Sequence, residues 1–240
     1  IKAMGEGAGL SYSGLTVAGL SFVLHTKQGV FVTGDNHIDI SNIQHPSLHL
    51  ESVILSAQGR WKHPQISVNS RNKQASLNLS GDAHFAAKQV SGAIKELQLD
   101  VEHYGQWQLD KPADFNYHQV DGWSLNSLCL TEKTSRLCGW GKAQNNRLKM
   151  AVTGSELPLS LLDMVVPLPV TFKGRLDIDT LIESSNGHLA GYGNFSQGPA
   201  GEPLLLFIDP SSKTPLSLND VNIGVTLKTQ RLTSQLIDSW

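Results

Sequence analysis

The sequence predicts an all-β fold, in which an elongated, curled sheet of antiparallel or mixed strands forms an apolar groove. Apolar residues recur at every second position in segment after segment, which is the pattern of half-buried strands. Turn-forming clusters such as Ser185-Asn186-Gly187 separate these segments. Charged residues make up only 17% of the chain while Ser, Thr, Asn, Gln and Gly are plentiful, which suits strands with a neutral polar outer face.

The alternation is clearest in five segments, which we expect to be strands: 77–85, 97–101, 148–152, 170–178 and 221–227. Upstream, the apolar positions change from even-numbered at 48 and 50 to odd-numbered at 53 and 55. Keeping one face inward then requires a bulge or a tight bend near Glu51-Ser52.

One short helix is expected at residues 158–166, where Leu159, Leu162 and Val166 share a face. Pro158 suits a helix start and Pro167 a helix stop. We expect residues 1–240 to form a single elongated segment, and the region 155–170 is the candidate for an internal boundary.

Glycine recurs in phase with the apolar positions, and each occurrence removes a side chain from the inward face. The positions are Gly59, Gly81, Gly154, Gly174, Gly191 and Gly193. Repeated along a sheet, such glycines would leave room for a trough. Alternatively, each glycine marks a bulge that bends a strand of an ordinary sandwich.

Composition excludes several classes of function. The net charge is −2 and Lys and Arg are scattered, so no basic patch exists for nucleic acid and we expect no such partner. No apolar run approaches the roughly 20 residues that span a bilayer. The start at Ile1-Lys2-Ala3-Met4 is neither a signal peptide nor an initiator, so we expect a segment of a longer protein, with any anchor outside it.

The two cysteines, Cys129 and Cys138, lie symmetrically about Lys133-Thr134. If the two arms pair as a hairpin, the cysteines stand directly opposite each other, with Cα atoms about 4.5–5.5 Å apart, which is disulfide range. A disulfide indicates an oxidising compartment, whereas the alternative is a pair of buried thiols in a reducing one.

No catalytic, metal-binding or cofactor-binding constellation emerges from the residue spacing. The nine histidines contain no His-x-His pair, and His45 and His49 flank a proline. Asp177 and Asp179 lie two apart on one strand face, as a glycosidase pair could, but a solvated outer face explains them better. We therefore expect no enzyme, no cofactor and no metal.

From His63 to Ile182 the chain resembles the TamB family of AsmA-like proteins of the Gram-negative envelope. Several stretches carry the resemblance by their order and spacing: 77–81, 107–113, 128–130 with 137–139, 156–159 leading to 168–169, and 173–176. The resemblance implies a periplasmic β-rich rod that is tethered to the inner membrane by a segment outside these residues. It also implies a role in carrying phospholipid between the membranes, an outer-membrane barrel partner, TamA, and no catalytic residue.

Together, the residues and the resemblance predict a lipid-conducting groove segment. The residues expected to face the lipid are Leu77, Leu79, Phe85, Leu97, Leu99, Val101, Leu148, Met150, Val152, Phe172, Leu176 and Ile178. One alternative is a module that chaperones outer-membrane proteins by β-augmentation at open sheet edges. A second alternative, a β-helical carbohydrate enzyme, has only Asp177 and Asp179 in its favour.

Overall fold

The computed structural model describes residues 2–12, 15–27, 30–31, 36–45, 48–164, 171–198, 203–207 and 215–228. Nineteen strands and one short 3₁₀ helix occupy these ranges, so the all-β prediction is confirmed. Contacts within the chain divide it into two compact units, residues 1–120 and 121–240.

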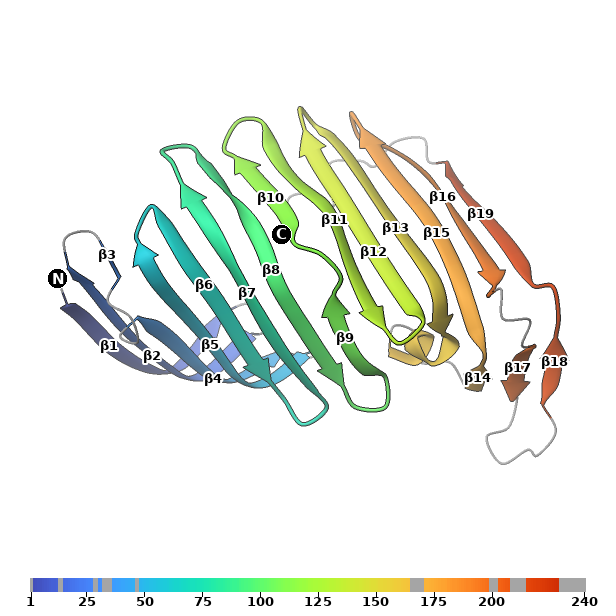
Figure 1. Ribbon diagram of the computed structural model, residues 1–240, viewed down its shortest axis with the longest axis horizontal. Coiled ribbons are helices and arrows are strands. Elements are labelled where there is room, and N and C mark those ends of the chain that lie inside the picture. Colours follow the sequence, from blue (N-terminus) through green and yellow to red (C-terminus); the bar gives the residue numbers. More distant parts are fainter. Residues whose placement is uncertain are drawn as a thin grey trace. The chain divides into compact units, whose positions relative to one another are not determined.

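The first unit is one sheet. Its strands are β1 (Lys2–Tyr12), β2 (Leu15–Lys27), β3 (Val30–Phe31), β4 (His37–His45), β5 (Leu48–Arg60), β6 (His63–Arg71), β7 (Ala75–Phe85), β8 (Gln89–Val101), β9 (Gly105–Leu109) and β10 (Ala113–His118). The pairing order is β1-β2-β4-β5-β6-β7-β8-β10, in which β3 also bridges β2 and β5 and β9 pairs with β8. Each of these pairs is antiparallel (Figure 1).

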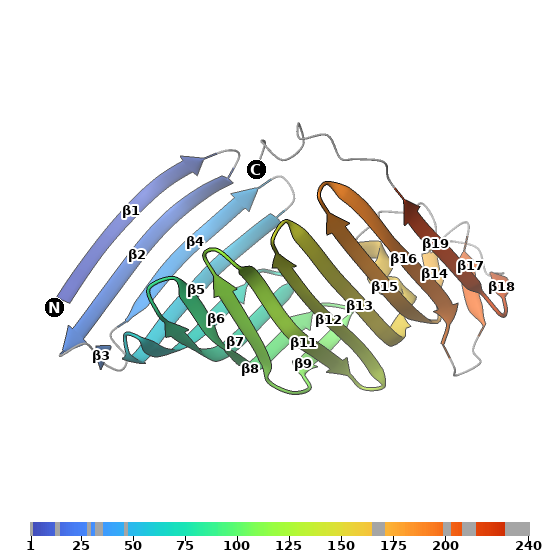
Figure 2. The same ribbon diagram turned by 90° about the horizontal axis from the view of Figure 1, so that it is seen from above.

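This sheet is strongly twisted. The twist is visible in Figure 2, where β1, β2 and β4 run in a different direction from β8. Adjacent strands rotate by about 20–25° on average, and the rotation accumulates along a sheet of this width. Near Glu51, where the sequence predicts a bulge or a tight bend, the β4–β5 ladder lacks the pair Asn42–Glu51 and Asn42 has a φ of 49°. The register is the same on both sides of this gap. Asn tolerates this left-handed conformation better than most residues do.

The second unit combines a large and a small antiparallel sheet. Its elements are β11 (Gly122–Glu132), β12 (Ser135–Gln144), β13 (Arg147–Pro158), the 3₁₀ helix η1 (Leu159–Met164), β14 (Thr171–Lys173), β15 (Arg175–Ser185), β16 (His188–Gln197), β17 (Leu204–Phe207), β18 (Leu216–Leu218) and β19 (Asn222–Lys228). The large sheet has the order β11-β12-β13-β15-β16-β19, and the small one β14-β17-β18.

Two-residue turns set the register of the large sheet. Asn145-Asn146 joins β12 to β13 and Asn186-Gly187 joins β15 to β16, all four residues with positive φ. Such a pair forms the mirror-image turn whose twist matches that of a hairpin, and Asn and Gly adopt it at low cost. These turns explain why the alternation on either side stays in phase.

Two expectations for residues 158–178 need correction. The helical residues form a 3₁₀ helix at Leu159–Met164, while Pro158 ends β13 and residues 165–170 lie outside the described part of the chain. The prediction of a single strand over 170–178 is wrong, because β14 ends and β15 begins on either side of Gly174, which has a φ of 124°. Only glycine adopts this conformation readily, and it directs β14 and β15 into different sheets.

Candidate functional site

One face of the sheet in the first unit is lined by apolar side chains in cross-strand rows. Residues that stand directly opposite each other in a ladder have their side chains on the same face. One row spans six strands: Phe22, Ile38, Leu55, Val68, Leu79 and Leu97. The next row contains Leu20, Ile40, Val53, Ser70, Leu77, Leu99 and Trp107. We call these residues the first apolar face.

The first apolar face is only half-buried in its middle. Leu55, Val68, Leu77 and Leu79 each keep part of their surface exposed. At one end Val101 and Trp107 are buried, and Trp107 Nε1 donates a hydrogen bond of 3.2 Å to the carbonyl oxygen of Tyr104. Among the described residues of this unit, no second layer of side chains covers the middle of the face, so its leucines gain burial only from their lateral neighbours.

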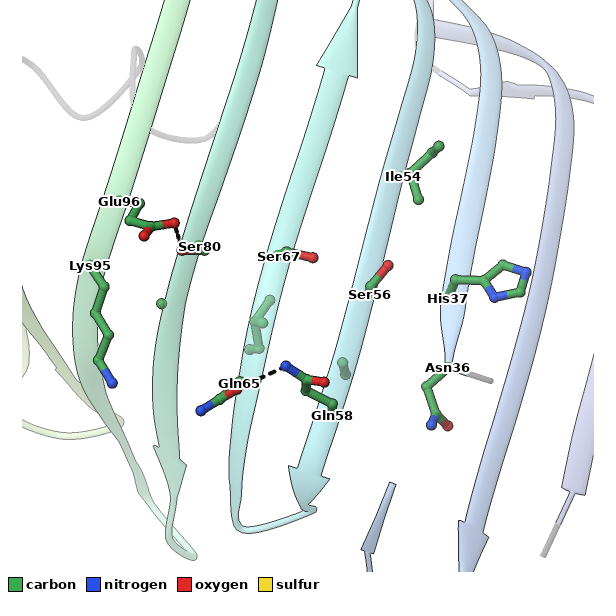
Figure 3. Close-up of a pocket in the computed structure, with 13 residues that line it drawn as sticks. Asn36, His37, Ile54, Ser56, Gln58, Gln65, Ser67, Ser80, Lys95 and Glu96 are labelled. Carbon is green, nitrogen blue, oxygen red and sulfur yellow. Dashed lines mark hydrogen bonds between the residues drawn. The ribbon is translucent and has the colours of Figure 1, made fainter. Parts of the chain in front are cut away.

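The opposite face of the same strands is polar, and a pocket of about 680 Å³ lies on it (Figure 3). Ser56, Ser67 and Ser80 stand in one row, and Ser80 Oγ donates a hydrogen bond of 2.9 Å to Glu96 Oε2. In the neighbouring row, Gln58 Nε2 donates to Gln65 Oε1 at 2.8 Å. The sheet is therefore amphipathic, and the hollow on these strands belongs to its polar side.

The second unit has an apolar face built in the same way, which we call the second apolar face. One row contains Leu130, Leu137, Gly154, Ile178, Phe195 and Ile223. The next contains Leu128, Gly139, Val152, Thr180, Gly193 and Val225, and a third contains Leu125, Gly141, Met150, Ile182, Gly191 and Leu227.

Three of the glycines in these rows, Gly141, Gly154 and Gly193, lie under neighbouring side chains. A Cβ atom added at Gly154 would come within 2.8 Å of Ile178 Cγ1 and still closer to Leu157. Gly81 behaves differently, since an added Cβ would collide with the carbonyl oxygen of Ala93, where the register of β7 against β8 shifts. The glycines thus serve both purposes, making room for a neighbouring side chain at Gly154 and allowing close backbone approach at a bulge at Gly81.

One end of the second apolar face is covered. Leu159 of η1, Leu204 of β17 and Leu176 of β15 form a buried cluster, against which Ile178 and Phe195 pack. The three leucines are 5–8% exposed, unlike the half-buried residues in the middle of the row. The 3₁₀ helix and the small sheet therefore close this end of the face.

The structure groups most of the sequence-predicted lining residues. Leu77, Leu79, Leu97 and Leu99 belong to the first apolar face, and Met150, Val152 and Ile178 belong to the second. Strand alternation puts Phe85 and Val101 on the same side as the first face, and Leu148 and Leu176 on the same side as the second. Phe172 is separated from them, because it lies in β14 opposite Leu206 of β17. The predicted lining set left out the members in β2, β4, β5 and β6. The spacing of Leu20 and Phe22, and of Ile38 and Ile40, carried the same signal.

The disulfide between Cys129 and Cys138 is present, with the two residues directly opposite in the β11–β12 hairpin and their Cα atoms 4.0 Å apart. The cysteines alternate with Leu128, Leu130 and Leu137, so they lie on the polar side of the sheet. The bridge joins the two arms of the hairpin without occupying the apolar face.

The acidic pair considered from the sequence has structural partners. Asp177 Oδ1 accepts a hydrogen bond of 2.7 Å from the backbone N–H of Glu156, and Tyr192 Oη lies 3.4 Å from Asp179 Oδ2. No group of three or more His, Cys, Asp or Glu residues within the described ranges is arranged to hold a metal ion.

A family model described as "TamB, N-terminal domain" matches residues 1–239. The chain belongs to this TamB family. No curated protein and no solved structure matches the chain. The family match extends beyond the stretch that carries the resemblance in the sequence, and it includes both apolar faces.

The TamB family works with TamA in the translocation and assembly module, and its members are periplasmic and membrane-anchored. The disulfide of this TamB chain agrees with such an oxidising compartment. Within the part of the TamB chain that the structure describes, no helix has the length and apolar character needed to span a bilayer.

Proposed function

We propose that this chain binds phospholipids and conducts them between the inner and outer membranes, with the acyl chains lying along its apolar faces. The observation that carries the proposal is the first apolar face: a row of six apolar residues on six strands, half-exposed, backed by a polar face. In a soluble sandwich a second sheet would cover such a surface, since open apolar area is costly in water.

The dimensions suit a lipid. The six-strand row of the first apolar face runs from β2 to β8, and neighbouring strands are about 4.8 Å apart, so the row is about 24 Å long across the strands. One leaflet of a bilayer has a hydrocarbon depth of about 15 Å, half of the usual core. The face can therefore hold acyl chains over their full length, and a lipid can pass from row to row without leaving it.

The energetic reason for such a face is the cost of carrying lipid through water. A two-chain phospholipid exposes about 30 CH₂ groups, at about 0.8 kcal/mol each, which amounts to about 24 kcal/mol. Apolar contact over the two rows removes a large part of this cost. The role requires no chemical step, so it requires no catalytic residue in this chain.

Site-specific photo-crosslinking tests the proposal. A photoreactive residue at Leu79 on the first apolar face, or at Met150 on the second, should capture lipid in cells. The matched controls are Asn78 and Lys149, the preceding residues on the same strands, whose side chains lie on the polar side. Phospholipid adducts are identified by mass spectrometry. Equal lipid capture at Leu79 and Asn78, or none at either, would contradict the proposal.

A second candidate function, chaperoning of outer-membrane proteins by β-augmentation, is favoured by one observation. Within the described residues, β19 pairs with β16 alone, and all seven of its residues are exposed. A strand edge of this kind can accept a further strand through backbone hydrogen bonds. This function predicts crosslinks to polypeptide at Val225, with lipid adducts absent from Leu79.

A further inference from the structure

Two histidines that are far apart in the sequence meet on the polar face of the first unit. His63 begins β6 and His84 is the penultimate residue of β7. The ladder between these strands pairs Gln65 with Asp82, and the N–H of Phe85 donates to the carbonyl oxygen of Lys62 at 2.9 Å. The same register places His63 opposite His84, and Figure 1 shows the two strands side by side.

The two imidazole rings are in contact and accessible. The Nδ1 atoms lie 2.9 Å apart, the ring centroids are 4.1 Å apart, and the rings meet edge to face at 68°. Both side chains are exposed. In the neutral pair one Nδ1 carries a hydrogen and the other accepts it, so the two nitrogens share a single hydrogen.

We propose that His63 and His84 form a binding site for a divalent transition-metal ion, Cu²⁺ or Zn²⁺, which takes the place of the shared hydrogen. Imidazole nitrogen is a preferred ligand of both ions. Two tetrahedral metal–nitrogen bonds of about 2.0–2.1 Å hold the nitrogens about 3.3 Å apart. The two nitrogens, now 2.9 Å apart, need to separate by only a few tenths of an ångström, and the rings must turn so that both Nδ1 lone pairs face the ion. Because both side chains are exposed, side-chain rotation supplies both movements. Water completes the coordination.

The charged surroundings set the strength of the site. Arg60 of β5 stands opposite His63, and its positive charge opposes a bound cation. Asp82 precedes His84 by two residues on the same face, but Lys95 Nζ lies 2.7 Å from its Oδ1 and offsets its charge. Ser91, opposite His84, is neutral. The site therefore binds through its two imidazoles rather than through the local field, and protons compete with the metal as the pH falls.

A bound metal ion would link β6 to β7 beside the turn at Trp61-Lys62 that joins β5 to β6. A ligand that binds only the folded chain stabilises it, so metal binding should raise the melting temperature. The site is invisible to patterns of neighbouring histidines, since 21 positions separate the two residues and only the strand register unites them.

Isothermal titration calorimetry of the 240-residue chain with CuCl₂ or ZnCl₂ tests the proposal. We expect one equivalent of metal to bind. His84→Ala should weaken binding at least about 10-fold, because even the loss of an outer-shell partner costs about 10- to 100-fold. His188→Ala, which removes an exposed histidine of the second unit, should leave the affinity unchanged. Arg60→Gln should tighten binding.

Thermal melts separate a specific site from scattered surface binding. Saturating Zn²⁺ should raise the melting temperature of the wild-type chain and leave that of the His63→Ala/His84→Ala variant unchanged. Wild-type metal affinity in the double variant, or no heat of binding in the wild-type chain, would overturn the assignment. Because both side chains are exposed, circular dichroism should show that the variants remain folded.

Discussion

Replacing Arg175 with alanine should destabilise the second unit by about 2–3 kcal/mol. Arg175 Nη1 lies 2.9 Å from Thr134 Oγ1, 3.3 Å from Ser135 Oγ and 3.1 Å from the carbonyl oxygen of Glu156. Through these contacts the first residue of β15 holds the turn of the β11–β12 hairpin and the irregular end of β13, where Glu156 has a φ of 50°.

The magnitude follows from the donor count and the burial. Nη1 carries two hydrogens, so it satisfies two of its three acceptors at a time. Each hydrogen bond to a charged group contributes about 1.5–3 kcal/mol, so two would contribute about 3–6 kcal/mol. We reduce this sum by about half, to about 2–3 kcal/mol, because the Arg175 side chain is 34% exposed and solvent screens its charge. The carboxylate of Glu156, at 3.8 Å, adds little. Ser135 Oγ keeps its own 2.7 Å bond to the Glu156 carbonyl oxygen, which limits the loss.

Urea denaturation followed by circular dichroism measures the change. Arg147→Ala, at the exposed start of β13, is the matched control and should shift the free energy of unfolding by less than about 0.5 kcal/mol. A double-mutant cycle with Thr134→Val isolates the hydrogen bond across the turn. If Arg175→Ala costs no more than Arg147→Ala, Arg175 does not hold the turn and the reasoning from its contacts is wrong.

Two other changes follow from the second unit. Replacing Cys129 and Cys138 with serine should lower the free energy of unfolding by about 2.5–3 kcal/mol, which is the loop-closure value for a sequence separation of 9. Thiol titration of the denatured, unreduced wild-type chain should find no free sulfhydryl. Two free thiols would contradict the bridge. Gly154→Val should lower the free energy of unfolding by about 1–3 kcal/mol, measured by denaturant unfolding, because the added side chain overlaps two apolar neighbours. Gly7→Ala is the control and should change stability little, because the space around Gly7 is open. Equal effects of the two substitutions would mean that Gly154 is not tightly packed.

Strand alternation was sufficient to predict the fold class, since the hairpin turns keep the apolar positions in phase over long stretches. The mirror placement of Cys129 and Cys138 about the turn also predicted their pairing correctly. Apolar alternation alone could not reveal the break at Gly174, because residues 170–178 alternate across it and the break arises from a backbone conformation. The pattern therefore placed Phe172 with Leu176, whereas the structure puts it in another sheet.

Other features depend on register, which periodicity does not specify. The register determines which residues stand opposite each other across neighbouring strands. It brings Ser56, Ser67 and Ser80 together in one pocket on the polar face, and it brings His63 into contact with His84. The alternation predicts that these residues share a face, but their order across the strands comes from turn lengths and bulges such as the one at Gly81. The lipid-facing role of the apolar residues stays a prediction until the crosslinking experiment is done.

The pairing of β4 through β8 has a consequence for how the chain assembles. From β5 to β8, each strand pairs with the strand that precedes it and the strand that follows it in the sequence, so every ladder is closed by a short loop. Short loops keep the entropic cost of closure small, and contacts between sequence neighbours speed folding relative to other β architectures. Like a solenoid, this stretch can grow one hairpin at a time, and its cooperativity extends only through adjacent strands. Removing two consecutive strands should shorten the array without exchanging its two faces.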